Sequence, residues 1–202
     1  MGIYKTTGLL TWSDKWDHVL ARCGYKRNQH GVQPGLYTLG SSDKKAPVFV
    51  TANYSLSFDA LRAALNGQNA YILVLDTKGI NVWCAAGKGT FGTDELISKV
   101  KSSGLKEKVS SHRLILPQLG ATGVSAHKVK TACGFEVEYG PVRAEDLPEY
   151  LITHTASTKM RTVRFNLLDR LVLIPVEMVN SFLPMILIAG VLFLLGGWFN
   201  LL

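Results

Sequence analysis

The last part of the chain restricts the fold most strongly. Residues 182–202 read FLPMILIAGVLFLLGGWFNLL and contain no charged side chain. A helix needs about 20 predominantly apolar residues to cross the hydrocarbon core of a bilayer. Uncharged runs of this length are rare in soluble domains, so the sequence predicts a transmembrane helix here. A buried hairpin of a soluble core is the alternative.

Basic residues gather just before this apolar run. Lys159, Arg161, Arg164 and Arg170 contribute to a formal net charge of +7. By the positive-inside rule, they predict a protein of the cytoplasmic membrane whose preceding residues face the cytoplasm. No basic stripe interleaved with aromatic residues occurs, so we expect no binding to nucleic acid. The intervening LLDRLVLIPVEMV (167–179) is too short and too charged for a span, and we predict an interfacial lead-in.

The change in composition along the chain predicts two domains. Residues 1–160 have the composition of a globular protein, and residues 161–202 form the membrane segment. This segment is either a single-span anchor or the start of a truncated domain with several spans. The N-terminus lacks an apolar core followed by a cleavage site, so we expect no signal peptide.

Strands and helices alternate along the globular part. Short apolar or β-branched runs predict strands, and amphipathic runs bounded by caps and glycines predict helices. The expected strands are 34–40, 46–54, 70–76, 112–121 and 135–143, and the expected helices are 12–24, 57–67, 93–104, 123–134 and 144–156. Ser13, Ser57 and Thr93 are the expected N-caps. This alternation predicts an α/β domain with a mainly parallel sheet.

Three polar or glycine-rich segments follow the expected strands. They are TANY (51–54), TKGINVWCAAGKGTFGT (77–93) and PQLGATG (117–123). Ligands of open parallel sheets bind beyond the carboxyl ends of the strands. We therefore expect these three segments to converge on one crevice.

The second of these segments contains a cysteine among small residues, and four interpretations are open. Residues 87–92, GKGTFG, match the phosphate-binding pattern G-x-G-x-x-G, but they lie far beyond Asp76 instead of directly after the strand. Cys84 could be a nucleophile, with a base supplied by His112, His127 or His154. It could be a small buried apolar residue. It could also be an axial metal ligand at the edge of a platform for a large flat ligand.

The other cysteines limit these possibilities. Cys23, Cys84 and Cys133 are widely spaced, and no pair has C-x-x-C spacing. We therefore expect neither an iron–sulfur cluster nor a zinc site within this chain. Widely spaced cysteines in odd number also favour a reducing compartment for the globular part.

The stretch NVWCAAGK (81–88) resembles the cap-helix motif of the corrinoid proteins of microbial mercury methylation. The resemblance continues in GTFGT, VQPGLYTLG, VFVTANYSLSFDALR, LPQLGATGVSAHKVK and GFEVEYGPVRAEDLP, and covers most of residues 12–202. The related corrinoid iron–sulfur proteins of acetyl-CoA synthesis share the domain type but lack a cysteine at this position. The chain has no D-x-H-x-x-G motif, which is typical of cobalamin modules with a histidine ligand. The family's membrane domain has several spans, whereas this chain has one clear span.

The resemblance implies a Rossmann-like corrinoid-binding domain in which Cys84 is the catalytic residue and the lower axial ligand of cobalt. The segment around Cys84 would form a helix under the corrin ring, and glycines would allow close approach of the ring. Residues at the strand ends would contact the cofactor's amide side chains or nucleotide tail. The expected cofactor-binding residues are Thr51, Asn53, Asn81, Val82, Trp83, Cys84, Ala85, Ala86, Gly87, Lys88, Gly89, Thr90, Gly92, Gln118 and Gly120.

The implied activity is corrinoid-dependent transfer of a methyl group from methyl-Co(III) to inorganic Hg(II), which gives methylmercury. A thiolate is a strong, soft donor that pushes electron density through cobalt toward the methyl group. The implied partners are a ferredoxin-like electron donor with two [4Fe–4S] clusters and a methyl donor protein or methyl-folate. The alternatives are a corrinoid carrier with another methyl acceptor, a non-catalytic cobalamin-binding fragment and an α/β domain without a cofactor.

Overall fold

The computed structural model describes residues 2–26 and 29–199. The chain divides into two compact units, which consist of residues 1–17 with 28–163 and of residues 18–27 with 164–202. The first unit contains the sheet, and the second contains the apolar end of the chain.

The first unit is built on a six-stranded sheet with the order β1-β2-β4-β3-β5-β6. The strands are β1 (Ile3–Thr6), β2 (Gly35–Leu39), β3 (Val48–Ala52), β4 (Ala70–Leu75), β5 (Arg113–Leu116) and β6 (Glu136–Tyr139). Neighbouring strands run parallel, except that β2 and β4 pair antiparallel. Strands β3 and β4 are buried along their whole length, as their continuous apolar runs predict. The expected α/β fold with a mainly parallel sheet is therefore confirmed.

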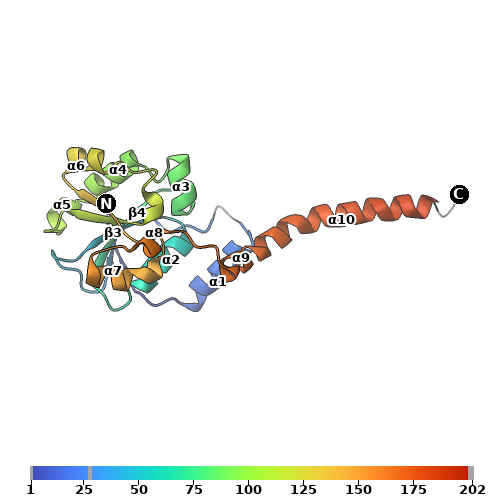
Figure 1. Cartoon of the computed structure of the whole chain (residues 1–202), viewed down its shortest axis with the longest axis horizontal. Coiled ribbons are helices and arrows are strands. Elements are labelled where there is room, and N and C mark those ends of the chain that lie inside the picture. The colour runs from blue at the N-terminus through green and yellow to red at the C-terminus, as the bar shows by residue number, and fades with distance from the viewer. Residues whose placement is uncertain (1, 27–28, 200–202) are drawn as a thin grey trace. The chain divides into compact units, whose positions relative to one another are not determined.

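Helices cover both faces of this sheet (Figure 1). One face packs against α3 (Val82–Lys88), α4 (Thr93–Ser102), α5 (Leu105–Lys108) and α6 (Ala126–Cys133). The other face packs against α2 (Ser55–Ala64), α7 (Leu147–Thr153) and α8 (Thr158–Arg161). Short 3₁₀ turns, η1 (Gln118–Gly120) and η2 (Ala144–Asp146), follow β5 and precede α7. Pro148 lies in the first turn of α7, so it begins this helix instead of interrupting it.

The first expected N-cap, Ser13, is wrong. Helix α1 (Trp12–Arg22) begins one turn earlier, at a reciprocal pair of Thr11 and Asp14. The Thr11 N–H and hydroxyl donate to Asp14 Oδ2 at 2.7 and 2.9 Å, and the Asp14 N–H donates to Thr11 Oγ1 at 3.2 Å. Ser13 therefore lies inside the helix, because the threonine and aspartate together satisfy more of its free N–H groups.

The other two expected N-caps, Ser57 and Thr93, are also wrong. Helix α2 begins after Tyr54 and α4 after Gly92, so both residues lie inside helices. Thr93 has a tertiary contact instead, since its Oγ1 accepts a hydrogen bond from the Ser125 N–H at 2.9 Å. The pattern of Ser and Thr before an apolar run thus located these helices but not their first residues.

The second unit contains α9 (Leu167–Leu171) and α10 (Ile174–Phe199). Within the described residues, one helical segment, Leu167–Gly196, is long and apolar enough to cross a membrane, and an 18-residue window of it has a mean hydropathy of 2.3 and is not buried. Glu177 lies in the first turn of α10. Helix α10 thus begins within the expected lead-in, at Ile174, and residues 200–202 of the expected span lie outside the described residues.

Candidate functional site

One amide oxygen joins two of the three segments that follow the strands. Asn53, directly after β3, is buried. Its Oδ1 accepts hydrogen bonds from the Thr77 N–H at 3.0 Å, the Thr77 hydroxyl at 2.8 Å and the Gly79 N–H at 3.0 Å. Thr77 is itself fully buried beyond the end of β4. The expected convergence of the segments after β3 and β4 is therefore confirmed.

The segment around Cys84 forms the seven-residue helix α3. Asn81 is its N-cap, and the Asn81 Oδ1 accepts a hydrogen bond from the Cys84 N–H at 2.9 Å. Gly89 ends the helix in the left-handed region, with a φ of 80°, which favours glycine. Val82, Ala85 and Ala86 are buried, whereas Trp83, Cys84, Gly87 and Lys88 are exposed.

The segment after β5 packs closely against the end of α3. A Cβ atom at Gly123 would lie 2.2 Å from the Phe91 carbonyl oxygen and 3.0 Å from Ala86 Cα. A Cβ atom at Gly120 would lie 2.6 Å from Phe91 Cε1. Phe91 is fully buried. The third segment therefore joins the other two, and only glycine permits its approach at these positions.

The turn after α3 contains two further predicted residues. The Thr90 hydroxyl donates to the Ala85 carbonyl at 3.4 Å. A Cβ atom at Gly92 would lie 2.6 Å from the Gly89 carbonyl oxygen. Thr90 and Gly92 therefore shape the turn that follows α3, and neither lies on α3 itself.

Two further predicted residues lie on β3 and on η1. Thr51 is buried within β3. Gln118, in η1, is half-buried, and its Oε1 accepts a hydrogen bond from Arg161 Nη1 at 2.6 Å. The polar groups of Asn53 and Gln118 thus have partners within the first unit.

The exposed face of α3 is open around the cysteine. Cys84, Gly87 and Lys88 have i, i+3, i+4 spacing, which puts them on one side of the helix. Cys84 is a free, exposed cysteine. A Cβ atom at Gly87 or Gly89 would meet nothing within 4 Å. A wide, flat ligand can therefore approach the thiol over Gly87, and a soft sulfur donor suits a cobalt ion. These residues fit a corrinoid.

Three residues that help to position the site were missed from the sequence. Thr77 anchors the loop to Asn53, Phe91 fills the space beneath the glycines, and the Glu95 Oε1 accepts the Asp76 N–H at 2.9 Å. Thr77 and Asp76 directly follow β4. The general position of ligand sites beyond the carboxyl ends of parallel strands could therefore have identified them. Phe91 is the one large apolar residue in its glycine-rich turn, which is a signal for burial.

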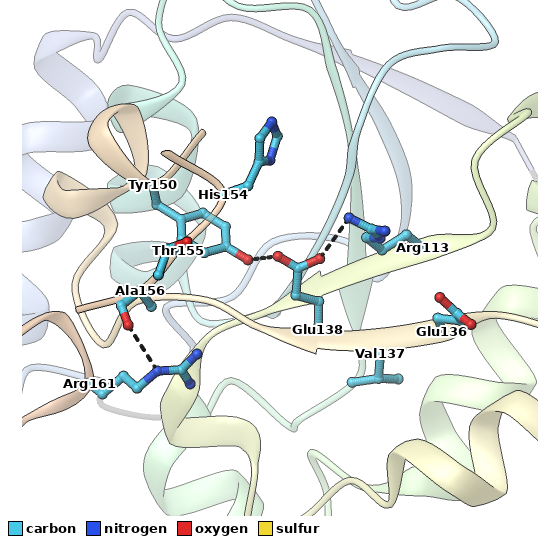
Figure 2. Close-up of a pocket in the computed structure, with 9 residues that line it drawn as sticks. All are labelled: Arg113, Glu136, Val137, Glu138, Tyr150, His154, Thr155, Ala156 and Arg161. Atoms are coloured by element: carbon cyan, nitrogen blue, oxygen red, sulfur yellow. Dashed lines mark hydrogen bonds and ion pairs between the residues drawn. The ribbon is translucent and has the colours of Figure 1, made fainter. Parts of the chain in front are cut away.

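A cavity lies apart from α3, between β5, β6 and α7. It has a volume of about 420 Å³, and Figure 2 shows His154 and Glu138 among its lining residues. Glu138 pairs with Arg113 at 3.2 Å and accepts a hydrogen bond from the Tyr150 hydroxyl.

In the part of the chain that the structure describes, no histidine is hydrogen-bonded to Cys84, so the geometry gives no support to a cysteine–histidine nucleophile.

Replacing Asn53 by alanine is expected to destabilise the first unit by about 1–3 kcal/mol. The substitution removes the acceptor of the buried Thr77 N–H and of the partly buried Gly79 N–H, which incurs their desolvation penalty. Hydrogen–deuterium exchange should become faster in residues 77–92. Asn69→Ala is the control, because Asn69 is exposed and its Oδ1 accepts the Ser41 N–H at 2.8 Å, away from this loop. Equal exchange in the two variants would contradict the anchoring role of Asn53.

The chain is similar to known proteins over most of the first unit. The family model of the CO dehydrogenase/acetyl-CoA synthase delta subunit matches residues 21–151. The corrinoid/iron-sulfur protein large subunit of Moorella thermoacetica is 28% identical over 154 residues, which cover 72% of this chain and 34% of that protein. The acetyl-CoA decarbonylase/synthase complex subunit gamma of Methanothermobacter thermautotrophicus is 31% identical over 127 residues, which cover 62% of this chain and 27% of that protein.

These matches cover about a third or less of each relative. The match to the family model includes α3 and the three segments that converge on it, which lie within residues 21–151. Because the matched residues make up more than half of the chain, the protein belongs to the CO dehydrogenase/acetyl-CoA synthase delta subunit family.

Proposed function

We propose that the first unit binds a corrinoid over the exposed face of α3, with Cys84 as the lower axial ligand of cobalt, and transfers a methyl group to inorganic Hg(II). The observation that carries this proposal is the exposed Cys84 thiol beside the open position of Gly87. The name of the Moorella thermoacetica relative supports a corrinoid as the cofactor class. The resemblance of residues 81–88 to the mercury-methylation motif supports Hg(II) as the acceptor.

Helix α3 fixes the direction of the Cys84 side chain. The Asn81 cap holds the Cys84 N–H, and buried Val82 and Ala85 attach the helix to the core of the first unit. The corrinoid, when bound, supplies a cobalt centre that carries the methyl group. Cys84 supplies a soft sulfur on one axial side, and Gly87 leaves space for the ring. Lys88 places an exposed cation on the same side for contacts with polar groups of the cofactor.

We further propose that α10 anchors the protein in the cytoplasmic membrane and that the first unit faces the cytoplasm. The apolar helix and the cations that precede it, which include Arg164 and Arg170, support this orientation. The electron donor is proposed to be a ferredoxin-like protein with two [4Fe–4S] clusters. The methyl group is proposed to come from a methyl donor protein or from methyl-folate.

A single-turnover assay tests the acceptor. The full chain in detergent is loaded with methylcobalamin without oxygen, mixed with thiol-bound Hg(II), and methylmercury is quantified. We expect faster formation than with free methylcobalamin at equal concentration. A parallel reaction offers homocysteine as a thiol acceptor. Faster methylation of homocysteine but not of mercury would favour the carrier with another acceptor. A colourless protein that takes up no cobalamin would contradict the corrinoid itself.

Replacing Gly87 by alanine is expected to change stability and cofactor binding in opposite directions. The new methyl group meets nothing within 4 Å, and alanine is favoured over glycine inside a helix by about 0.5–1 kcal/mol, so the first unit should become more stable. The same methyl group protrudes beside the Cys84 thiol and should weaken cobalamin binding several-fold. Thermal unfolding and a cobalamin titration measure the two effects. Unchanged cobalamin affinity would show that the ring does not lie over position 87.

A further inference from the structure

Helix α1 contacts the rest of the first unit through acidic side chains. The Asp14 Oδ2 pairs with Arg62 Nη2 at 2.7 Å. The Asp17 Oδ1 lies 2.7 Å from His30 Nδ1, and its Oδ2 accepts a hydrogen bond from the Ser55 hydroxyl at 2.6 Å. Surface helices of soluble domains normally turn their apolar side to the core. In α1 it is the acidic side that faces inward, and no residue of α1 is buried.

The apolar side of α1 faces outward. Trp12, Trp16 and Val19 have i, i+4, i+7 spacing and form one stripe along the helix, opposite Asp14 and Asp17. Their exposed fractions are 85%, 64% and 47%. Large exposed apolar stripes of this kind are typical of interaction sites. Such a stripe favours contact with a surface that is itself apolar.

Cations lie along one edge of this stripe. Lys15 and Arg22 are exposed and, at i and i+7, share one side of α1. The Lys15 Nζ lies 5.2 Å from the centre of the Trp12 ring. Tryptophan beside lysine or arginine is typical of helices in the lipid–water interface, where the ring enters the acyl region and the cation binds anionic headgroups.

The last residues of α1 belong to the same compact unit as α10. This unit combines residues 18–27 with 164–202. A Cβ atom at Gly24 would lie 3.1 Å from Val176 Cγ2, so this segment packs against the first turns of α10. A membrane span begins at the headgroup region, and the end of α1 is therefore close to that depth.

We propose that α1 lies in the lipid–water interface of a bilayer with anionic lipids, with Trp12, Trp16 and Val19 inserted and Lys15 and Arg22 at the headgroups. Asp14 and Asp17 hold the opposite side of α1 to the first unit. The inference depends on α10 as a membrane span and is independent of the cofactor and of the methyl acceptor.

Lipid quenching of single tryptophans tests this inference. Each variant of the full chain keeps one of Trp16, Trp83 and Trp198, with phenylalanine at the other tryptophan positions. The variants are reconstituted in vesicles of phosphatidylcholine and phosphatidylglycerol whose acyl chains are brominated near the headgroup. Trp16 is expected to be quenched several-fold more than Trp83, which is exposed on α3. Trp198, in the apolar run, reports insertion of α10.

The outcomes distinguish the interfacial position of α1 from the membrane span of α10. If Trp198 is quenched but Trp16 is not, α10 spans the membrane and α1 does not lie in the interface. If neither tryptophan is quenched, both the span of α10 and the interfacial position of α1 are wrong. Trp16 that is protected from aqueous iodide but is not quenched by brominated lipid would show a protein partner or a second copy instead of lipid. Replacing Lys15 and Arg22 by glutamate should lower Trp16 quenching only in vesicles with phosphatidylglycerol. An equal effect in pure phosphatidylcholine would contradict the role of the anionic headgroups.

Discussion

Replacing Cys84 by alanine is expected to slow methyl transfer to Hg(II) by more than about 100-fold, because loss of a residue that only hydrogen-bonds to a metal ligand already lowers activity by about 10–100-fold. The fold should survive, since Cys84 is exposed and the hydrogen bond to Asn81 comes from its main chain. The measurement is the initial rate of methylmercury formation by the full chain at saturating methylcobalamin.

Two further variants make this result specific. Cys133→Ala should retain the rate, because Cys133 lies on α6, where its thiol donates to the Val129 carbonyl at 3.1 Å. Cys84→His should still bind the cofactor but transfer the methyl group more slowly, since imidazole donates less electron density than thiolate. Equal rates for the native protein and Cys84→Ala, with cobalamin bound to both, would show that Cys84 is not the axial ligand.

Replacing Arg62 by leucine is expected to destabilise the first unit by about 3–5 kcal/mol, as removal of one partner from a buried ion pair does. Arg62 Nε pairs with Asp59 at 2.6 Å, and both side chains are buried. Arg62 also donates to the carbonyls of Thr7 and Leu9, each at 2.8 Å. The variant therefore removes the cation that pairs with the buried Asp59 carboxylate and releases the segment that leads into α1.

The charges around Arg62 also indicate that its ion pairs stabilise the first unit. Burial by itself lowers the pKa of Arg62, but hydrogen bonds to Asp59 and Asp14 outweigh it and raise the pKa above its ordinary value. Partial burial raises the pKa of Asp14, but hydrogen bonds from Thr11 and Arg62 outweigh it and lower the pKa. A lowered carboxyl pKa stabilises the fold above the ordinary value of about 4, and this contribution is lost as the pH falls through the lowered pKa.

Hydrogen–deuterium exchange of the buried β3 and β4 amides measures the stability of the first unit in the Arg62→Leu variant. Adding Asp59→Asn removes the negative charge of the buried carboxylate and should restore part of the lost stability. Lys78→Leu is the control, because Lys78 and its partner Asp76 form an exposed pair at 2.7 Å. If the β3 and β4 amides exchange as slowly in Arg62→Leu as in the control, the ion pair of Arg62 and Asp59 does not hold the first unit together.

The sheet was predictable from sequence because its strands are buried on both faces. Runs such as AYILVL in β4 are apolar throughout, which distinguishes them from the amphipathic helices between them. Edge strand β1 was not predicted, since IYKT is short and largely exposed. The start of α10 was misplaced because Glu177 lowers the local hydropathy inside this helix, whereas Asp169 and Arg170 belong to the separate helix α9.

The site was partly predictable because its parts follow strands. Asn53 and the segment containing Cys84 were identified by their positions, and the structure joins them through Thr77 and Gly79. The packing of Gly123 on Phe91 was not predictable, because it depends on the close approach of two loops that are distant in sequence. The inverted orientation of α1 was also hidden, since periodicity reveals an apolar stripe but not the direction in which it faces.

X-ray absorption at the cobalt edge of the full chain loaded with cobalamin tests the central claim most directly. The native protein is expected to show sulfur in the first coordination shell of cobalt, and Cys84→Ala is expected to lack it. A shell of nitrogen and oxygen alone in the native protein, with cobalamin bound, would contradict the assignment of Cys84 as the axial ligand.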